Sequence, residues 1–161
     1  MKKIILISFL LSVFIFSARA QHDSTAQSRL SGLLTSYYDI KDALVSGKAT
    51  EAAAKADQFI KMANGIDYKV VSEGNLHILL KDATAISESK DISKQRITFA
   101  NLSLNMATLA KTVKLSSMPV YQQYCPMKKT YWLSNEKAIR NPYYGSSMLT
   151  CGQVTDTFTR N

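Results

Sequence analysis

The sequence has few of the residues that interrupt regular structure. Of its 161 residues only six are glycine and three are proline, and aromatic residues make up 9%. So little glycine and proline excludes a collagen-like chain, and an apolar content of 46% excludes a disordered one. The length and composition predict one globular domain with enough apolar residues to bury a hydrophobic core.

Only one long hydrophobic run is present, at residues 4–16, and it carries no charge. Two lysines precede it, and Ala18 and Ala20 follow it at the positions that a signal peptidase reads. A run of this length is too short to span a bilayer as a helix. Residues 1–20 are therefore predicted to be a signal peptide cleaved near Ala20. The mature protein is expected to be periplasmic or secreted, without a transmembrane anchor.

Strong charge of one sign is also absent. Removing residues 1–20 leaves 17 basic and 12 acidic residues, a net charge of about +5. This balance is too mildly basic to indicate nucleic acid, and no nucleic-acid partner is predicted. Motifs for catalysis are missing as well. The sequence has no nucleotide-binding loop, and His77 is the only histidine after residue 28 that could serve a cysteine nucleophile. The protein is predicted not to be an enzyme.

The middle of the chain has the apolar spacing of helices. Residues 21–28 are polar and are predicted to be a disordered N-terminus. Apolar residues then recur at helical intervals in four segments, which predicts four helices. Their expected ranges are about 29–46, 50–64, 75–89 and 91–115. Short polar connections favour antiparallel neighbours. The predicted fold is all-α: a single helical domain over residues 29–161, a four-helix bundle with an irregular, aromatic-rich C-terminal cap over 116–155.

The composition changes after Lys114. All three prolines, both cysteines, the single tryptophan and five of the eight tyrosines lie in the remaining residues. Helical spacing is absent there, and the pairs Asn141-Pro142 and Tyr144-Gly145 are turn signals. Long irregular segments of this kind are usually functional or covalently stapled. The function is therefore expected to lie in this segment.

Two short words in this segment place one thiol and one thioether close together in the sequence. Cys125 and Met127 are two residues apart, and Met148 and Cys151 are three apart. Thiolate and thioether sulfurs are soft donors that select Cu(I) and related ions. An extended Cys-Pro-Met segment would turn Cys125 and Met127 toward one ion, and Met148 and Cys151 would lie one helical turn apart. The four sulfurs are the predicted metal ligands.

Two alternatives stay open at this stage. A pair of cysteines in an exported domain commonly forms a disulfide, and a Cys125–Cys151 bridge would stabilise the fold by roughly 3–4 kcal/mol. His77 is a secondary candidate ligand, although a lone histidine near the start of a helix is more often a hydrogen-bonded boundary residue. A Zn(II) site is less favoured, because structural zinc takes cysteine and histidine rather than methionine.

The chain resembles a bacterial family catalogued as domain of unknown function 3347. The resemblance is carried by the segment from Asp91 to Phe99, by Tyr-Cys-Pro-Met ending at Met127, and by Asn-Pro-Tyr-Tyr-Gly leading to Cys151-Gly152. The residues of the family pattern that are interpreted as structural are Arg96, Phe99, Ser103, Trp132, Asn141, Pro142, Gly145 and Gly152. We expect Arg96 to hold loop carbonyls or an acidic partner, Trp132 to hold the cap by burial, and Asn141 to bond turn backbone.

The resemblance implies a role near heavy-metal efflux. Members occur alone after a signal peptide or joined to periplasmic adaptor subunits of efflux systems. The Tyr-Cys-Pro-Met motif is also similar to that of small heavy-metal-binding domains, but Lys128 and Lys129 replace the His-Pro that follows there. The predicted function is binding of Cu(I) or Ag(I) for handover to a periplasmic adaptor or another efflux component. The alternative is a non-metallated, disulfide-stapled interaction module of a membrane-associated efflux assembly.

Overall fold

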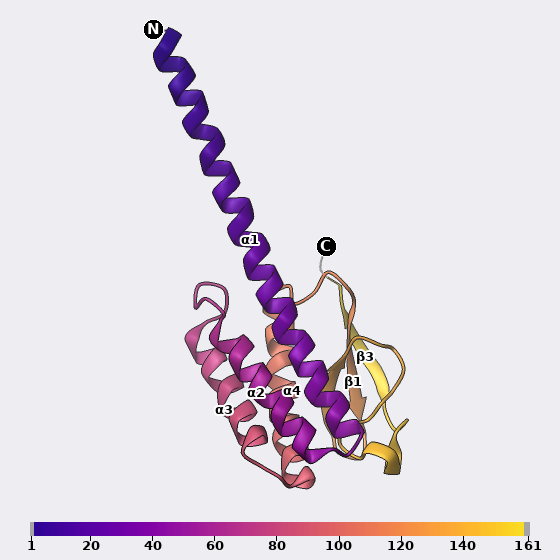
Figure 1. Ribbon diagram of the computed structural model, residues 1–161. Coiled ribbons are helices and arrows are strands. Elements are labelled where there is room, and N and C mark those ends of the chain that lie inside the picture. The colour runs from indigo at the N-terminus through magenta and orange to yellow at the C-terminus, as the bar shows by residue number, and fades with distance from the viewer. Residues whose placement is uncertain (1, 160–161) are drawn as a thin grey trace.

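The protein folds into a body of four helices with a small antiparallel sheet on one side (Figure 1). The computed structural model describes the backbone of residues 2–159 and the side chains of residues 24–159. Each helix packs on the next one along the chain, and the sheet contacts the helices mainly through α4. The four expected helices are therefore present, but the fold is not all-α.

The first helix, α1 (Lys2–Val45), is longer at its N-terminal end than the sequence predicted. Its N-terminal part runs beyond the other helices (Figure 1), and the segment 21–28, expected to be disordered, is helical. The side chains of residues 1–20, on which the signal-peptide prediction depends, lie outside the described residues. From Leu30 onward α1 presents a buried apolar stripe to the other helices. In the part of the chain that the structure describes, no helix is both long enough and apolar enough to cross a membrane.

The other three helices begin and end close to the predicted positions. They are α2 (Ala49–Asn64), α3 (Glu73–Ser87) and α4 (Ile92–Thr112). The Asp91 carboxylate accepts hydrogen bonds from the backbone N–H groups of Ser93 and Lys94, which satisfies two donors at the start of α4. Phe59 from α2 and Phe99 from α4 are fully buried, so the helical stripes meet in one core.

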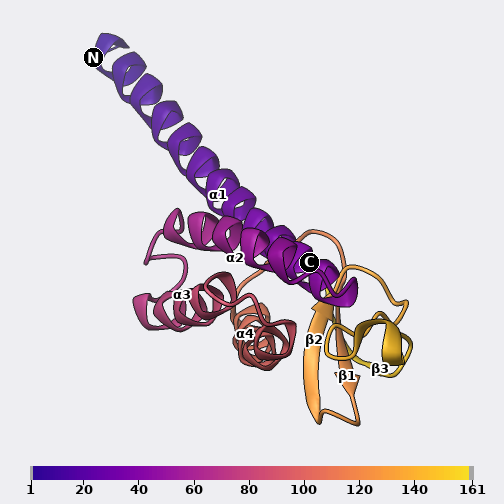
Figure 2. The ribbon, with the colours of Figure 1, turned by 60° about the horizontal axis from the view of Figure 1, so that its bottom comes forward.

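The segment predicted as an irregular cap contains three strands and a short helix. They are β1 (Val120–Cys125), β2 (Thr130–Ser134), the single-turn 3-10 helix η1 (Gly145–Met148) and β3 (Gln153–Phe158). The strand order is β2-β1-β3, with both pairings antiparallel. Figure 2 shows this sheet beside α4. The all-α prediction was wrong because aromatic and β-branched residues in these runs favour strands even without a helical or long alternating pattern.

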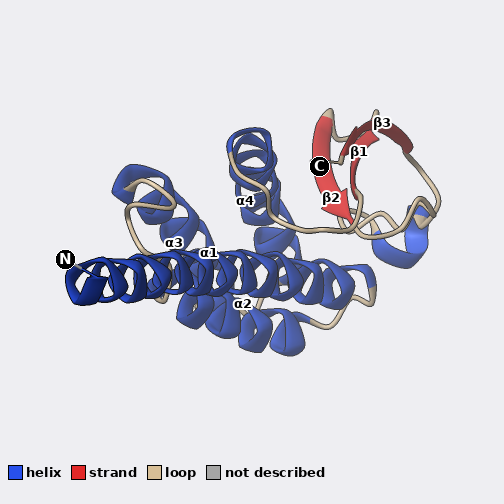
Figure 3. Ribbon diagram, turned by 90° about the horizontal axis from the view of Figure 1, so that it is seen from above, coloured by secondary structure: helices blue, strands red, loops and turns tan. Residues whose placement is uncertain are grey.

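A buried hydroxyl connects the helices to the sheet. The Tyr37 Oη of α1 lies 2.7 Å from the Ser103 Oγ of α4 and accepts a hydrogen bond of 3.0 Å from the backbone N–H of Leu133 in β2. The Tyr37 ring also stacks on Phe99, with ring centroids 5.1 Å apart. Figure 3 shows the three strands together on one side of the helical body, where α1 and α4 can both reach them. Phe99 and Ser103 thus have the structural roles expected from the sequence.

This contact gives a prediction with a matched control. Tyr37→Phe keeps the stacked ring but leaves the Leu133 N–H buried without its acceptor, so it lowers the free energy of unfolding by about 1–2 kcal/mol. The neighbouring Tyr38 hydroxyl is buried with no hydrogen-bond partner. Tyr38→Phe is therefore expected to leave stability unchanged or to raise it. Urea denaturation of both variants measures the difference, and equal losses for the two would contradict the bridging role of Tyr37.

Candidate functional site

The two cysteines meet at one end of the sheet. Cys125 is the last residue of β1 and is fully buried, and Cys151 follows η1 and is partly exposed. Both are free thiols. β3 begins two residues after Cys151, and its first residue, Gln153, pairs with Tyr124 beside Cys125. The antiparallel pairing of β1 and β3 therefore brings together two thiols that are 26 positions apart in the sequence.

Asn141 holds the two cysteine segments together. Its side-chain amide nitrogen donates to the Cys125 Sγ at 3.2 Å and to the Cys151 carbonyl oxygen at 2.7 Å. Its side-chain oxygen accepts from the Tyr143 N–H at 2.8 Å, and its own backbone N–H donates to the Leu149 carbonyl oxygen at 2.8 Å. Asn141 is fully buried. It bonds turn backbone as the sequence predicted, but its contact with a thiol was not foreseen.

The thiols also influence one another electrostatically. Burial raises the pKa of the Cys151 thiol above its ordinary value, and interaction with the Cys125 side chain raises it further. A thiol with a raised pKa holds its proton more firmly, so an ion that binds the Cys151 sulfur must displace a proton.

Close packing surrounds the Cys125 and Cys151 segments on the side that faces the sheet. The fully buried Trp132 lies on β2, and its ring packs edge-on against Tyr143 with centroids 5.9 Å apart. Gly152 has a φ of +154°, and a Cβ there would lie 2.8 Å from the Trp132 ring and 2.9 Å from the Tyr124 carbonyl oxygen. Only glycine allows the chain to leave Cys151 this close to β1. Pro142, which follows Asn141, is also buried.

The two methionines are on the segments next to the thiols, and both are exposed. The exposed fraction is 61% for Met127 and 38% for Met148. Residues 126–129 form the turn between β1 and β2, so Cys125 and Met127 are not on one face of an extended arm as predicted. The Cys151 N–H donates to the Met148 carbonyl oxygen at 3.1 Å, which places these two residues one turn apart as predicted.

One contact links the two methionine segments. The Lys128 ammonium lies 5.6 Å from the centre of the Tyr144 ring, and Tyr144 immediately precedes η1, which ends at Met148. The turn after Cys125 therefore lies against the segment that leads to Cys151. Across residues 24–159, no three His, Cys, Asp or Glu side chains form a group able to hold a metal ion. Any metal site here consists of the two thiols, with thioethers as the neighbouring soft donors.

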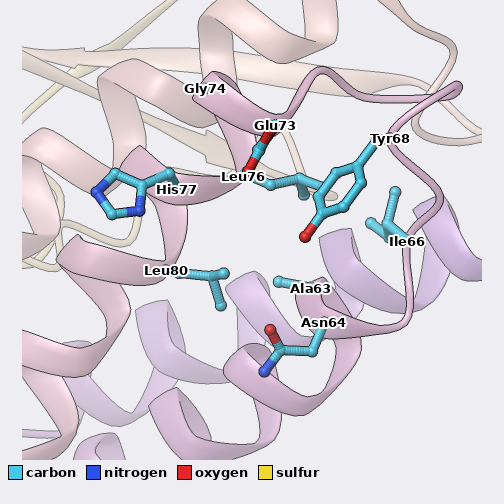
Figure 4. Close-up of a pocket in the computed structure, with 9 residues that line it drawn as sticks. All are labelled: Ala63, Asn64, Ile66, Tyr68, Glu73, Gly74, Leu76, His77 and Leu80. Carbon is cyan, nitrogen blue, oxygen red and sulfur yellow. The ribbon is translucent and has the colours of Figure 1, made fainter.

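His77 belongs to a different part of the molecule. It is exposed on α3 and lines a cavity of about 420 Å³ between the end of α2 and the start of α3. Figure 4 shows Tyr68, Glu73 and Leu76 around the same space. None of the lining residues comes from the C-terminal sheet. The structure therefore places His77 at this cavity and does not bring it to the thiol pair.

Arg96 and Gly145 hold the start of η1 close to the end of α1. The Arg96 guanidinium donates to the Leu44 carbonyl oxygen at the end of α1, at 2.9 Å. Gly145 has a φ of +57°, and a Cβ there would lie 2.5 Å from Arg96 Nη2 and 2.9 Å from the Val45 carbonyl oxygen. Arg96 thus holds a carbonyl group, as expected, and η1 starts where the backbone passes close to it.

Sequence reasoning missed Gln123, whose side chain holds the loop that follows β2. Its side chain is fully buried on β1, and the amide nitrogen donates to the carbonyl oxygens of Glu136, Lys137 and Ala138 at 2.8–3.3 Å. The hydroxyl of Tyr143 donates to the Tyr131 carbonyl oxygen of β2. The only sequence signal for the contacts of Gln123 is its place between aromatic residues in the run Tyr-Gln-Gln-Tyr. That signal does not specify the bonding partner.

These features define a small helical domain whose C-terminal sheet carries a pair of free thiols. Comparison with protein families matches residues 33–118 to the family described as "Protein of unknown function (DUF3347)". The match covers more than half of the chain, and the protein belongs to this family. The matched region contains the C-terminal part of α1 and all of α2, α3 and α4, and it ends before Cys125, so the thiol pair lies outside it. Neither the curated proteins nor the solved structures gave a significant match.

Proposed function

We propose that the protein is an exported periplasmic protein that binds one soft monovalent ion, Cu(I) in function and Ag(I) as its mimic. The observation that carries the proposal is the adjacency of Cys125 and Cys151, since the Asn141 amide donates both to the Cys125 sulfur and to the Cys151 carbonyl oxygen. Two thiolates are soft donors and suit Cu(I) better than Mg(II) or Ca(II). Met127 and Met148 are the thioether donors available on the adjoining segments.

The surroundings of the pair support a preorganised site. Asn141, Trp132 and Gly152 fix the backbone on both sides of the sulfurs, so little ordering is needed when an ion binds. The Asn141 amide N–H bonds the Cys125 sulfur directly and would be an outer-shell donor to a bound ion. Such outer-shell donors typically change metal affinity by about 10–100-fold. Asn141 is therefore a positioning residue in this proposal.

Partial exposure suits a carrier rather than a store. Cys125 is buried while Cys151 and the two methionines are accessible, so an incoming donor can reach the ion from the open side. Sulfur ligands can then replace one another at the ion one at a time, and the ion passes to a second protein without release into water. A periplasmic adaptor or another component of an efflux system is the proposed receiver.

The same adjacency supports one alternative, a disulfide-stapled interaction module. Oxidation would join the two sulfurs, release two protons and two electrons to an external oxidant, and remove both thiolate donors. The loop that closes would span residues 125–151 and stabilise the fold by roughly 3–4 kcal/mol on the chain-entropy account. Metal binding and the staple are mutually exclusive states of one pair, so a single measurement on the reduced protein separates them.

An anaerobic competition titration tests the metal proposal. The reduced protein is titrated against a chromophoric Cu(I) chelator, and we expect it to withdraw one equivalent of Cu(I). Zn(II) offered to the same sample is expected to bind far more weakly, because it prefers four ligands that include cysteine and histidine. Equal affinity for Zn(II), or no withdrawal of Cu(I) by fully reduced thiols, would count against a soft-ion site.

The apparent affinity for Cu(I) is expected to rise with pH. The ion must displace a proton from Cys151, and the raised pKa of this thiol extends proton competition to higher pH than for an ordinary cysteine. The affinity should climb by up to about tenfold per pH unit for each proton displaced, and level off only above the usual thiol pKa. The titration repeated at several pH values measures this slope. Cys151→Ser removes one of the displaced protons and should make the slope shallower. An affinity independent of pH in the parent protein would contradict the prediction.

A further inference from the structure

The C-terminal segment has a larger excess of basic residues for its length than the helical body. Residues 24–112, which end with α4, carry eleven Lys or Arg and nine Asp or Glu. Residues 113–159 carry five basic residues and only two acidic ones, Glu136 and Asp156. The net charge is therefore +2 for the helical part and +3 for the shorter segment that forms the sheet and its loops.

Three of these cations lie at the thiol end of the sheet. Lys128 and Lys129 are in the turn directly after Cys125, and Arg140 precedes Asn141, which bonds the Cys125 sulfur. All three side chains are exposed, and the turn 126–129 and the segment 140–152 contain no acidic residue. The ion pairs found among residues 24–159 all lie between Asp39 and Lys55, so none of them neutralises these three cations.

The same end of the molecule exposes apolar side chains. Met127, Met148 and Leu149 are exposed by 61%, 38% and 38%. They lie on the two segments that meet where Lys128 covers the Tyr144 ring. Apolar residues surrounded by exposed charge are the usual composition of a protein–protein contact. We call Lys128, Lys129, Arg140, Met127, Met148 and Leu149 together the thiol-end surface.

We propose that the thiol-end surface docks an acidic segment of a partner protein, which receives the ion from Cys125 and Cys151. The transfer of the ion rests on the proposed function. The binding of an acidic segment by the three cations does not depend on metal binding. A bis-thiolate Cu(I) centre carries one net negative charge, which the three cations also offset. An anionic lipid surface is the less suitable occupant, because it has no soft donor, whereas a protein with an acidic segment can carry cysteine or methionine beside that segment to receive the ion.

The test measures binding of a labelled polyglutamate peptide to the metal-free protein by fluorescence anisotropy. Lys128→Glu/Lys129→Glu/Arg140→Glu reverses the three cations of the thiol-end surface. Lys69→Glu/Lys81→Glu/Lys90→Glu makes the same change in net charge at exposed positions in the helical body. We expect about a tenfold or greater loss of affinity in the first variant, less than about twofold in the second, and weaker binding of the parent protein as salt increases. Circular dichroism checks that both variants are folded.

Each outcome decides the proposal. Similar losses in the two variants would mean that only net charge matters, which would overturn a localised docking surface. Absence of peptide binding by the parent protein would overturn it too, as would tighter binding to vesicles of equal parts phosphatidylglycerol and phosphatidylcholine. If the charge variant misfolds, Lys128→Gln/Lys129→Gln/Arg140→Gln repeats the comparison with a milder change. Cu(I) uptake is measured on separate samples, so loss of the metal function with intact peptide binding leaves the docking surface standing.

Discussion

Replacing either Cys125 or Cys151 by serine is expected to lower the affinity for Cu(I) by more than about 100-fold. The loss of an outer-shell partner costs roughly 10–100-fold, and the loss of a direct ligand should cost more. A hydroxyl is a hard donor with a much higher pKa than a thiol, so it does not replace a thiolate at a soft ion. The buried Cys125 side chain is nearly the same size as serine, so the sheet should remain intact. Competition titration of each variant against the parent protein measures the loss.

Methionine variants provide a graded control for the same experiment. Met127→Leu and Met148→Leu remove the two neighbouring thioethers and should weaken binding by about 3–10-fold, because a neutral thioether contributes less than a thiolate. Met118 is 70% exposed but precedes β1 at the end of the strand opposite Cys125. Met118→Leu should leave the affinity unchanged. Equal effects of all three methionine variants would show that the thioethers near the thiols have no special role.

Gly145→Ala is expected to destabilise the fold by about 2–4 kcal/mol, the largest loss of stability that we predict for a single methyl group. The backbone of Gly145 has a φ of +57°, which an alanine adopts only at a cost. The added Cβ would also lie 2.5 Å from the Arg96 guanidinium and 2.9 Å from the Val45 carbonyl oxygen, which is backbone and cannot rotate away. The contact between η1 and the end of α1 must therefore open.

Gly47 separates the two causes. It has a φ of +71°, but a Cβ there would meet no atom within 4 Å. Gly47→Ala therefore tests backbone strain alone and should cost about 1 kcal/mol. Urea denaturation of the two variants gives the difference, which is the contribution of close packing at Gly145. If both variants lose the same free energy of unfolding, the clash with Arg96 and Val45 is not a constraint on the fold.

The helical part of the fold could be predicted because its pattern is local. Apolar spacing defined α2 to within one residue at its start, and Asp91 marked the start of α4 through its N-cap hydrogen bonds. The strands were missed because β1 and β3 are paired over a long sequence separation, and neither shows strict alternation. In β3, five of the six residues are exposed, so no buried face was available to reveal it.

The sequence predicted that the segments of Cys125 and Cys151 belong together, but it did not predict their geometry. The spacing of Met148 and Cys151 is local, and the observed turn matches it. The position of Met127 depends on where β1 ends, since the chain turns immediately after Cys125 and carries the methionine outward. The contact between Asn141 and the Cys125 sulfur depends on the tertiary packing of two loops, and no property of a single segment indicates it.

Native mass spectrometry of the protein, isolated without reductant and offered Cu(I) after mild reduction, tests the central claim most directly. The account predicts that the reduced protein takes up one copper ion, and that the Cys125→Ser/Cys151→Ser variant takes up none. A pair that stays oxidised under mild reduction would contradict it and favour the disulfide-stapled module. Equal copper uptake by the variant would show that the ion binds elsewhere, and that the two thiols are not the site.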